Sequence, residues 1–314
     1  MGFIEVKDLK VHFPIRSGFW NRITDWVYAV DGVDMEIEQG KTYGLVGESG
    51  SGKSTIGRTI IGLEKATAGH IYFNGEEITN KRLSSIPEFN RSVQMIFQDS
   101  LSSFNPKKRI IDIIAEPIRN FDHLSPSEEK KRVIELLEII GLNEEALYKY
   151  PHEFSGGQRQ RIGVARSIAS NPKLIIADEP VSALDLSVQA QVLNYMKRIQ
   201  DEFNLSYIFI SHDLGVVKHM CDYLHIMYHG RFVEKGTRKD IYTNPQHIYT
   251  KRLLSAIPVI DPINRDKHKL ERKQTEALYQ EKQNAYYDEK GRVFDMTQLT
   301  NTHYAALDPK GGAH

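Results

Sequence analysis

The chain has 314 residues, of which 40% are hydrophobic and 26% are charged, so it can bury the core of one large domain or of one domain with an appendage. Its 41 basic and 41 acidic residues give no net charge, which excludes the overall positive field of many nucleic-acid-binding proteins. Its single cysteine, Cys221, excludes an intrachain disulfide and a cysteine cluster for zinc or iron-sulfur, and indicates a reducing compartment.

No uncharged apolar run reaches the roughly 18 residues of a membrane-spanning helix. The first residues follow a strand pattern and not that of a signal peptide. We therefore expect a cytoplasmic protein that spans no membrane.

The N-terminal part predicts a small antiparallel sheet. Residues 4–13 and 33–37 alternate apolar and polar side chains, as half-buried strands do, and residues 14–27 between them form a long hairpin insertion. Residues 67–78 contain Asn74 and Gly75, a dipeptide that favours the tight turn of a further hairpin. We expect both hairpins to belong to the same sheet.

A phosphate-binding loop lies between these hairpins, with the spacing G-x-x-x-x-G-K-[ST] between a predicted strand and a predicted helix. Its glycines let backbone N–H groups turn toward phosphate oxygens, Lys53 reaches the β- and γ-phosphates, and the Ser54 hydroxyl ligates magnesium. An ordinary glycine-rich turn is the alternative, which the flanking elements disfavour. The predicted triphosphate-binding residues are Gly47, Glu48, Ser49, Gly50, Ser51, Gly52, Lys53, Ser54 and Thr55.

Helices follow the sheet. Ser125 and Glu128 form a capping box with Pro126 at the first helical position, and apolar residues recur at helical spacing until Gly141. A second glycine turn, Ser155-Gly156-Gly157-Gln158, leads into another helix. An isolated Ser-Gly-Gly would be read as a helix N-cap. One nucleotide does not need two phosphate-binding turns from the same chain, however. We therefore expect the second turn to bind the nucleotide of a partner subunit.

The rest of the chain predicts a parallel α/β sheet. Apolar strands over residues 174–177 and 207–210 alternate with helices over residues 188–203 and 214–219, and ligands are expected at the carboxyl ends of such strands. Beyond Pro262 the chain is polar, and we expect an appendage that is only partly ordered.

Two carboxylates end the first of these strands. Asp178 is expected to hold magnesium through its water shell, and Glu179 to polarise the water that attacks the γ-phosphate. Asp-Glu-Pro is also a common surface turn, but the phosphate loop upstream favours the functional interpretation.

Together these motifs resemble an ATP-binding-cassette (ABC) ATPase, of which Ser-Gly-Gly-Gln is the signature. Gln98 matches the glutamine loop, Asp185 matches the D-loop and His212 matches the switch histidine. A lone glutamine or histidine is more often solvated or structural, and the spacing among the other motifs overturns that interpretation. The resemblance implies a P-loop sheet core, an antiparallel β subdomain, a helical signature subdomain and a C-terminal extension.

The resemblance also implies boundaries and roles. The ATPase domain would span residues 1–250, with the helical subdomain at about 95–165, and the extension would span 251–314. Two such domains would close head to tail over two ATP molecules. The catalytic residues would be Glu179, His212 and Gln98. The Mg²⁺ ligands would be Ser54, Gln98 and Asp178. Adenine would stack on Phe13, favoured slightly, or on Tyr28, with Trp26 third; each of these aromatics could instead be packing in the core.

Four longer sequence segments resemble those of the ATPases of oligopeptide and dipeptide importers. They are residues 29–33, 102–106, 179–191 and 244–258. The last segment is expected to be structural, since it takes no part in nucleotide contacts. Some subunits of this branch carry a C-terminal cysteine cluster, which this chain lacks, so it resembles the F-type subunit. The resemblance extends to about residue 262.

The implied partners are a second ATPase subunit in a heterodimer, two transmembrane permease subunits and an extracytoplasmic peptide-binding protein, at the cytoplasmic face of a prokaryotic cell membrane. Nucleic acid is not expected. Nickel or glutathione import is the nearest alternative. A soluble cassette protein of translation or DNA repair is less favoured, because those usually carry two cassettes or a long coiled-coil insertion. A GTP-binding switch is disfavoured, because this chain lacks the Asn-Lys-x-Asp motif that recognises guanine.

Overall fold

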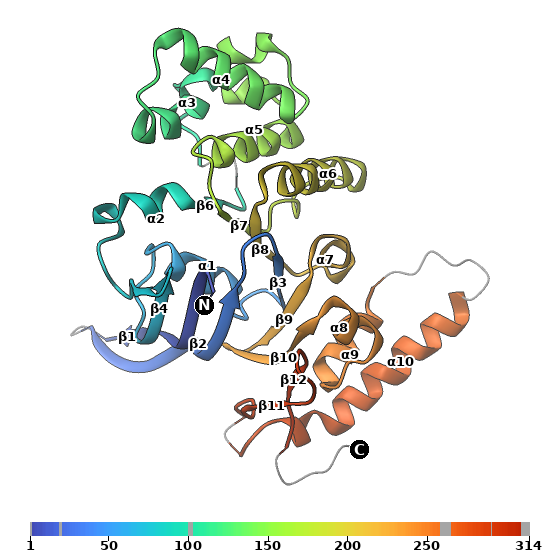
Figure 1. The fold of residues 1–314 in the computed structure, drawn as a ribbon. Coiled ribbons are helices and arrows are strands. Elements are labelled where there is room, and N and C mark those ends of the chain that lie inside the picture. The colour runs from blue at the N-terminus through green and yellow to red at the C-terminus, as the bar shows by residue number, and fades with distance from the viewer. Residues whose placement is uncertain (1, 19–20, 100–102, 258–264, 290, 309–314) are drawn as a thin grey trace. The chain divides into compact units, whose positions relative to one another are not determined.

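The chain forms two compact units, and each of them mixes helices and strands (Figure 1). The first comprises residues 1–36, 42–80 and 211–314, and the second comprises residues 37–41 and 81–210. This structure, a computed structural model, describes residues 2–18, 21–99, 103–257, 265–289 and 291–308. Within these ranges, no helix is both long enough and apolar enough to cross a bilayer.

An antiparallel sheet opens the first unit, in the order β2-β1-β4-β5. Its strands are β1 (Ile4–Ser17), β2 (Arg22–Ile37), β4 (Ala68–Phe73) and β5 (Glu76–Glu77). Most of the segment predicted as an insertion, residues 14–27, consists of the exposed outer ends of β1 and β2. These ends show no alternation because both of their faces meet water. The predicted turn is confirmed, since Asn74 and Gly75 have φ angles of 51° and 82°, as a two-residue hairpin turn requires.

A second group of strands in this unit lies in the order β11-β12-β10-β9-β3. The pair of β3 (Thr42–Val46) and β9 (Tyr223–Tyr228) is parallel, and the other pairs are antiparallel. The remaining strands are β10 (Arg231–Thr237), β11 (Met296–Gln298) and β12 (Tyr304–Ala306). The helices are α1 (Lys53–Ile60), α7 (Leu214–Met220), α8 (Arg238–Thr243), α9 (Ile248–Ser255) and α10 (Arg265–Lys282), with a 3₁₀ turn at Gln283–Tyr286.

The C-terminal segment is built into this sheet. β12 pairs with β10, with Tyr304 opposite Lys235 and Ala305 opposite Glu234. Ala305 and Ala306 are fully buried. The sequence predicts only a partly ordered appendage here, because strands of three residues are too short to show an alternating pattern.

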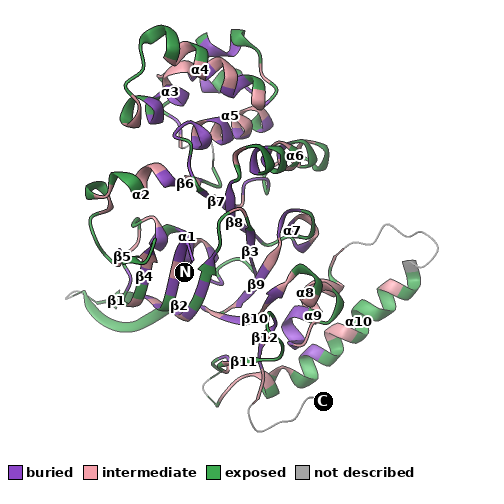
Figure 2. Ribbon diagram, in the orientation of Figure 1, coloured by how far each residue is buried: buried purple, intermediate pink, exposed green. Residues whose placement is uncertain are grey.

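The second unit contains three parallel strands, β6 (Val93–Ile96), β7 (Leu174–Asp178) and β8 (Ser206–Ser211). Every residue of β7 and β8 is buried, as their purple colour in Figure 2 shows. Burial on both faces explains why these strands read as continuous apolar runs. The helices are α2 (Pro87–Ser92), α3 (Ile110–Phe121), α4 (Pro126–Ile139), α5 (Gly156–Ile168) and α6 (Leu186–Phe203), with 3₁₀ turns at Leu83–Ser85, Glu144–Tyr148 and Pro151–Glu153.

Helices α3, α4 and α5 pack against one another and bury the apolar positions predicted for α4. The predicted capping box is confirmed: the Ser125 hydroxyl accepts the Glu128 N–H, and the Glu128 carboxylate accepts the Ser125 N–H at 2.8 Å. Gly141, with a φ of 70°, lies just after the helix ends.

Replacing Ser125 with alanine is expected to lower the free energy of unfolding by about 1 kcal/mol, because the first turn of α4 loses its cap. Urea unfolding of the full chain measures this effect. Ser187→Ala, at an exposed site in the first turn of α6, is the matched control and should change stability much less. Equal effects of the two substitutions would mean that the cap contributes nothing.

Candidate functional site

The predicted phosphate loop joins the buried strand β3 to helix α1, which begins at Lys53. Glycine is required at two of its positions. A Cβ on Gly47 would collide with the carbonyl oxygen of Met227, and a Cβ on Gly52 would collide with that of Ala29. Gly52 also has a φ of 105°, which side chains disfavour. The backbone of the loop is therefore packed directly against neighbouring backbone.

The Lys53 side chain lies inside this loop and is only 4% exposed. Its ammonium donates hydrogen bonds to the carbonyl oxygens of Gly47 and Glu48, at 2.8 and 2.7 Å, and to the hydroxyl of Ser51 at 3.3 Å. A cation held among loop atoms at the start of a helix is suited to an anionic ligand.

The second unit brings two of the predicted catalytic residues together. Glu179 follows β7 and is half-buried, and its carboxylate accepts a hydrogen bond of 2.9 Å from the Gln98 side-chain amide. Its N–H donates to the carbonyl of Ile210, and its φ of 46° is unusual for a residue other than glycine. Strain of this kind clusters at functional sites. The preceding carboxylate, Asp178, is 1% exposed at the end of β7.

The signature turn is a helix start in the second unit. The Ser155 hydroxyl accepts the Gln158 N–H, and the Gln158 side chain accepts the Ser155 N–H at 2.9 Å, which caps α5. A Cβ on Gly157 would collide with Val188 of α6. The capping interpretation of Ser-Gly-Gly therefore holds for Ser155, and the buried glycine allows α5 to approach α6 closely. Asp185 is exposed immediately before α6.

The predicted switch histidine and the two candidate adenine-stacking aromatics are exposed, whereas Ser54 and Thr55 are half-buried at the start of α1. His212 lies in the turn between β8 and α7. Phe13 and Tyr28 are 38% and 55% exposed. Tyr28 is adjacent in the chain to Ala29, whose carbonyl packs against Gly52 of the phosphate loop, and its ring meets that of His12 edge-on at 4.6 Å.

The described residues contain no group of three or more His, Cys, Asp and Glu side chains that could hold a metal ion. The predicted magnesium ligands are instead a hydroxyl, an amide oxygen and one carboxylate, from Ser54, Gln98 and Asp178. Oxygen donors with few carboxylates fit Mg²⁺, which keeps several waters and takes the rest of its ligands from substrate phosphates.

Comparison with known proteins identifies the family. Residues 30–182 match the family model described as ABC transporter, and residues 233–289 match the one described as oligopeptide/dipeptide transporter, C-terminal region. The chain is 58% identical, over 98% of its length and 97% of the relative, to the oligopeptide transport ATP-binding protein OppF of Lactococcus lactis subsp. lactis. This chain is an ABC transporter ATPase of the oligopeptide/dipeptide branch. The OppF of Escherichia coli K12 is 50% identical to this ABC ATPase, over 82% of the chain and 78% of that relative.

A solved structure supports the same assignment. The dimeric ATP-binding cassette MJ0796, in a post-hydrolysis state bound to ADP and phosphate, matches with a TM-score of 0.66 and 26% identity, over 75% of this chain and 98% of that one. The predicted family and its fold class are thereby confirmed, and ATP is established as the nucleotide of the family to which this ABC ATPase belongs.

Two residues next to the phosphate loop are marked by no sequence motif. Tyr249 and Arg252 of α9 both contact Glu48. They belong to the segment 244–258, which the sequence marks as typical of peptide importers but assigns a structural role. No periodicity or motif links residue 249 to residue 48, so only the fold could reveal the contact.

Proposed function

We propose that this chain hydrolyses ATP to energise the import of peptides, oligopeptides above all, through an ABC transporter. The observation that carries the proposal is the high identity to an oligopeptide transport ATP-binding protein over nearly the whole chain. That likeness includes the C-terminal region described for oligopeptide/dipeptide transporters, which a generic ATPase core would not require.

The proposed chemistry is positioning and charge neutralisation of a transferring phosphoryl group. Lys53 binds the β- and γ-phosphates, Glu179 orients the attacking water, and His212 stabilises the charge that develops on the γ-phosphate. Gln98 holds the Glu179 carboxylate through its amide. Mg²⁺ supplies positive charge on the phosphates when it is bound, and the proposed ligands are Ser54, Gln98 and Asp178.

The remaining roles concern the base and the partner. We propose that Tyr28 stacks on adenine in preference to Phe13, because Ala29 next to it lies against the phosphate loop. The turn from Ser155 to Gln158 serves the ATP of a second ATPase subunit, and Asp185 lies at the contact between the subunits. The full set of partners is that subunit, two permeases and a peptide-binding protein, at the cytoplasmic face of the membrane.

Transport of labelled peptide tests this proposal. Cells that lack the gene should lose uptake of a labelled oligopeptide and regain it from a plasmid copy. In the purified transporter, a peptide-loaded binding protein should stimulate ATP hydrolysis, whereas the unloaded binding protein should stimulate it less. Normal oligopeptide uptake in the deletion strain would contradict the proposal.

The same experiment separates the alternatives. Loss of nickel or glutathione uptake with intact peptide uptake would assign the ATPase to a related importer. Co-purification with ribosomes or DNA, and not with permeases, would assign it to the soluble cassette proteins.

A further inference from the structure

Tyr249 of α9 reaches the phosphate loop from the C-terminal region. Its side chain is fully buried, and its hydroxyl accepts a hydrogen bond of 3.1 Å from the backbone N–H of Glu48. Burial raises the pKa of this hydroxyl above its usual range, so it remains a neutral partner for the amide at all ordinary pH values.

The peptide between Gly47 and Glu48 is consequently held on both of its sides. Its carbonyl oxygen, on Gly47, accepts the Lys53 ammonium at 2.8 Å, and its N–H, on Glu48, donates to Tyr249. In a planar trans peptide these two groups point in opposite directions. Tyr249 therefore fixes the rotation of the peptide plane whose other edge engages the phosphate-binding lysine.

Arg252, one helical turn along α9, holds the side chain of the same residue. Its guanidinium lies 3.1 Å from the Glu48 carboxylate and 2.8 Å from that of Glu276 on α10, and it stacks over the Tyr279 ring at 4.6 Å. The Arg252 contact holds the pKa of Glu276 below its usual value. Since the carboxylates are half-exposed, these pairs contribute little to stability, and orientation is the function that they can serve.

A small, partly open pocket of about 60 Å³ lies between the loop and Tyr249 of α9. Its lining comes from the phosphate loop and from aromatic residues of the C-terminal half of the chain, namely Glu48, Ser49, Gly50, Ser51, Tyr228, His229 and Tyr249. Tyr249 and the phosphate loop therefore line one common pocket.

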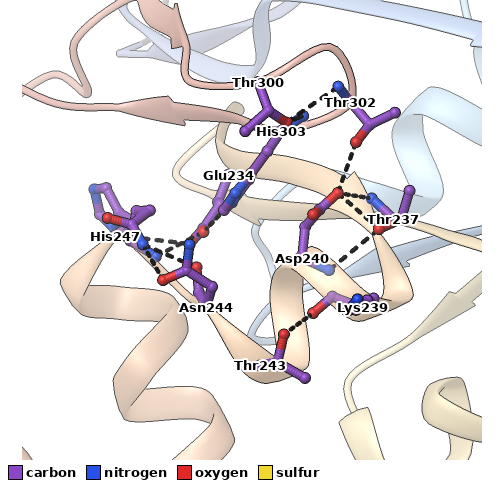
Figure 3. Close-up of polar contacts among 11 residues, drawn as sticks. Glu234, Thr237, Lys239, Asp240, Thr243, Asn244, His247, Thr300, Thr302 and His303 are labelled. Carbon is purple, nitrogen blue, oxygen red and sulfur yellow. Dashed lines mark hydrogen bonds and ion pairs between the residues drawn. The ribbon is translucent and has the colours of Figure 1, made fainter.

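The start of α9 is anchored in turn by a buried carboxylate, as Figure 3 shows. Glu234 of β10 is fully buried and accepts the N–H groups of Gln246 and His247, at 2.7 and 3.0 Å, just before the helix. His303, next to β12, is hydrogen-bonded to Glu234 at 2.7 Å through its Nε2 and is also buried. The last strands of the chain thereby secure the helix that contacts the loop.

We propose that Tyr249 and Arg252 are positioning residues that set the affinity for ATP by orienting Glu48 in the phosphate loop. The inference rests on the proposed function, since it concerns the nucleotide that the loop would bind. It assigns to the C-terminal region of this ATPase a role in nucleotide binding that acts through the loop and not through contact with the nucleotide.

Nucleotide binding to the purified full chain, measured with Mg-ATP by calorimetry, tests the proposal. Tyr249→Phe removes only the hydroxyl, and the Kd for ATP is expected to rise about fivefold, as loss of one hydrogen bond implies. The matched control is Tyr242→Phe, which removes another hydroxyl, half-buried and bonded at 2.5 Å to the carbonyl of Leu214, away from the loop. Its Kd should equal that of the wild type even if both variants unfold at lower temperature.

Arg252→Gln provides a second, independent test, since the half-exposed side chain of Arg252 can be replaced without leaving a cavity. The Kd should rise again, and the rise should be smaller when Glu48→Gln is already present, because the two side chains act as a pair. Arg231→Gln, which breaks an ion pair with Asp295, is its control and should leave the Kd unchanged. In the assembled transporter, Tyr249→Phe should raise KM for ATP and leave kcat unaltered.

Unchanged or tighter ATP binding by both Tyr249→Phe and Arg252→Gln, with a wild-type chain that binds ATP, would overturn the positioning role and leave the proposed function intact. A wild-type chain that binds no ATP would overturn both.

Discussion

Glu179→Gln is expected to lower kcat for ATP hydrolysis by at least about a hundredfold, the usual contribution of a positioned general base. The amide that replaces the carboxylate cannot accept a proton from water. It can still accept the Gln98 hydrogen bond, which is now made to the Glu179 carboxylate at 2.9 Å. The loss should therefore be in chemistry and not in folding.

Phosphate release by the assembled transporter measures the effect, alongside the Kd for ATP, which should stay within the wild-type range. Glu202→Gln, on an exposed part of α6, is the matched control and should hydrolyse ATP normally. A Glu179→Gln variant with the wild-type rate would show that another group activates the water. A variant that no longer binds ATP would instead implicate the backbone at this strained position.

Substitution of Gln98 tests the same hydrogen bond from its donor side. If its amide fixes the Glu179 carboxylate, Gln98→Ala should lower kcat by less than Glu179→Gln does, since the carboxylate remains but its orientation is lost. The double variant should lose less than the product of the two single effects, because the part of the Gln98 effect that acts through Glu179 is already gone.

The sequence predicts elements well wherever one short segment contains the whole signal. The Ser125 cap, the Asn74-Gly75 turn and the buried strands β7 and β8 all follow from local chemistry, and the structure contains each of them. The phosphate loop is identified in the same way, because its glycines, lysine and serine are consecutive.

Contacts between distant segments are not accessible to such reasoning. β12 was missed because its three residues are ordered by pairing with β10, far away in the chain, and not by a pattern of their own. Tyr249 and Arg252 look like parts of an ordinary amphipathic helix. Glu234, another residue that no motif marks, accepts the His247 N–H and so helps to hold α9 where it contacts Glu48.

Acid is expected to destabilise the first unit strongly, because two of its histidines are buried. Burial lowers the pKa of His225 and of His247 to about 3, from a usual value of 6.5, and the nearby cations Lys235 and Lys251 lower it further. His225 packs on the ring of Phe232 at 4.9 Å, and His247 meets the ring of Tyr286 at 4.8 Å. Neither Nδ1 of His225 nor Nε2 of His247 has a hydrogen-bond partner. Protonation of either ring inside the folded unit would therefore cost free energy.

The direction follows from proton binding. Between pH 6.5 and pH 3 the unfolded chain binds a proton on each histidine and the folded chain does not, so stability rises with pH in this window and is lost as the pH falls. At pH 4.5, about two units below the unfolded pKa, each histidine should cost on the order of 3 kcal/mol, and the two together on the order of 5 kcal/mol. That loss is comparable to the whole stability of many domains.

Urea unfolding of the full chain at pH 7 and pH 4.5 measures this loss. His225→Leu keeps an apolar group of similar size in the pocket and cannot be protonated, so the difference in stability between the two pH values should shrink by about 3 kcal/mol. His123→Leu is the control, because His123 is exposed and its ring meets water in both states. If His225→Leu leaves the pH dependence as steep as in the wild type, His225 takes up its proton inside the folded unit, and the acid sensitivity must come from His247 or from carboxylates instead.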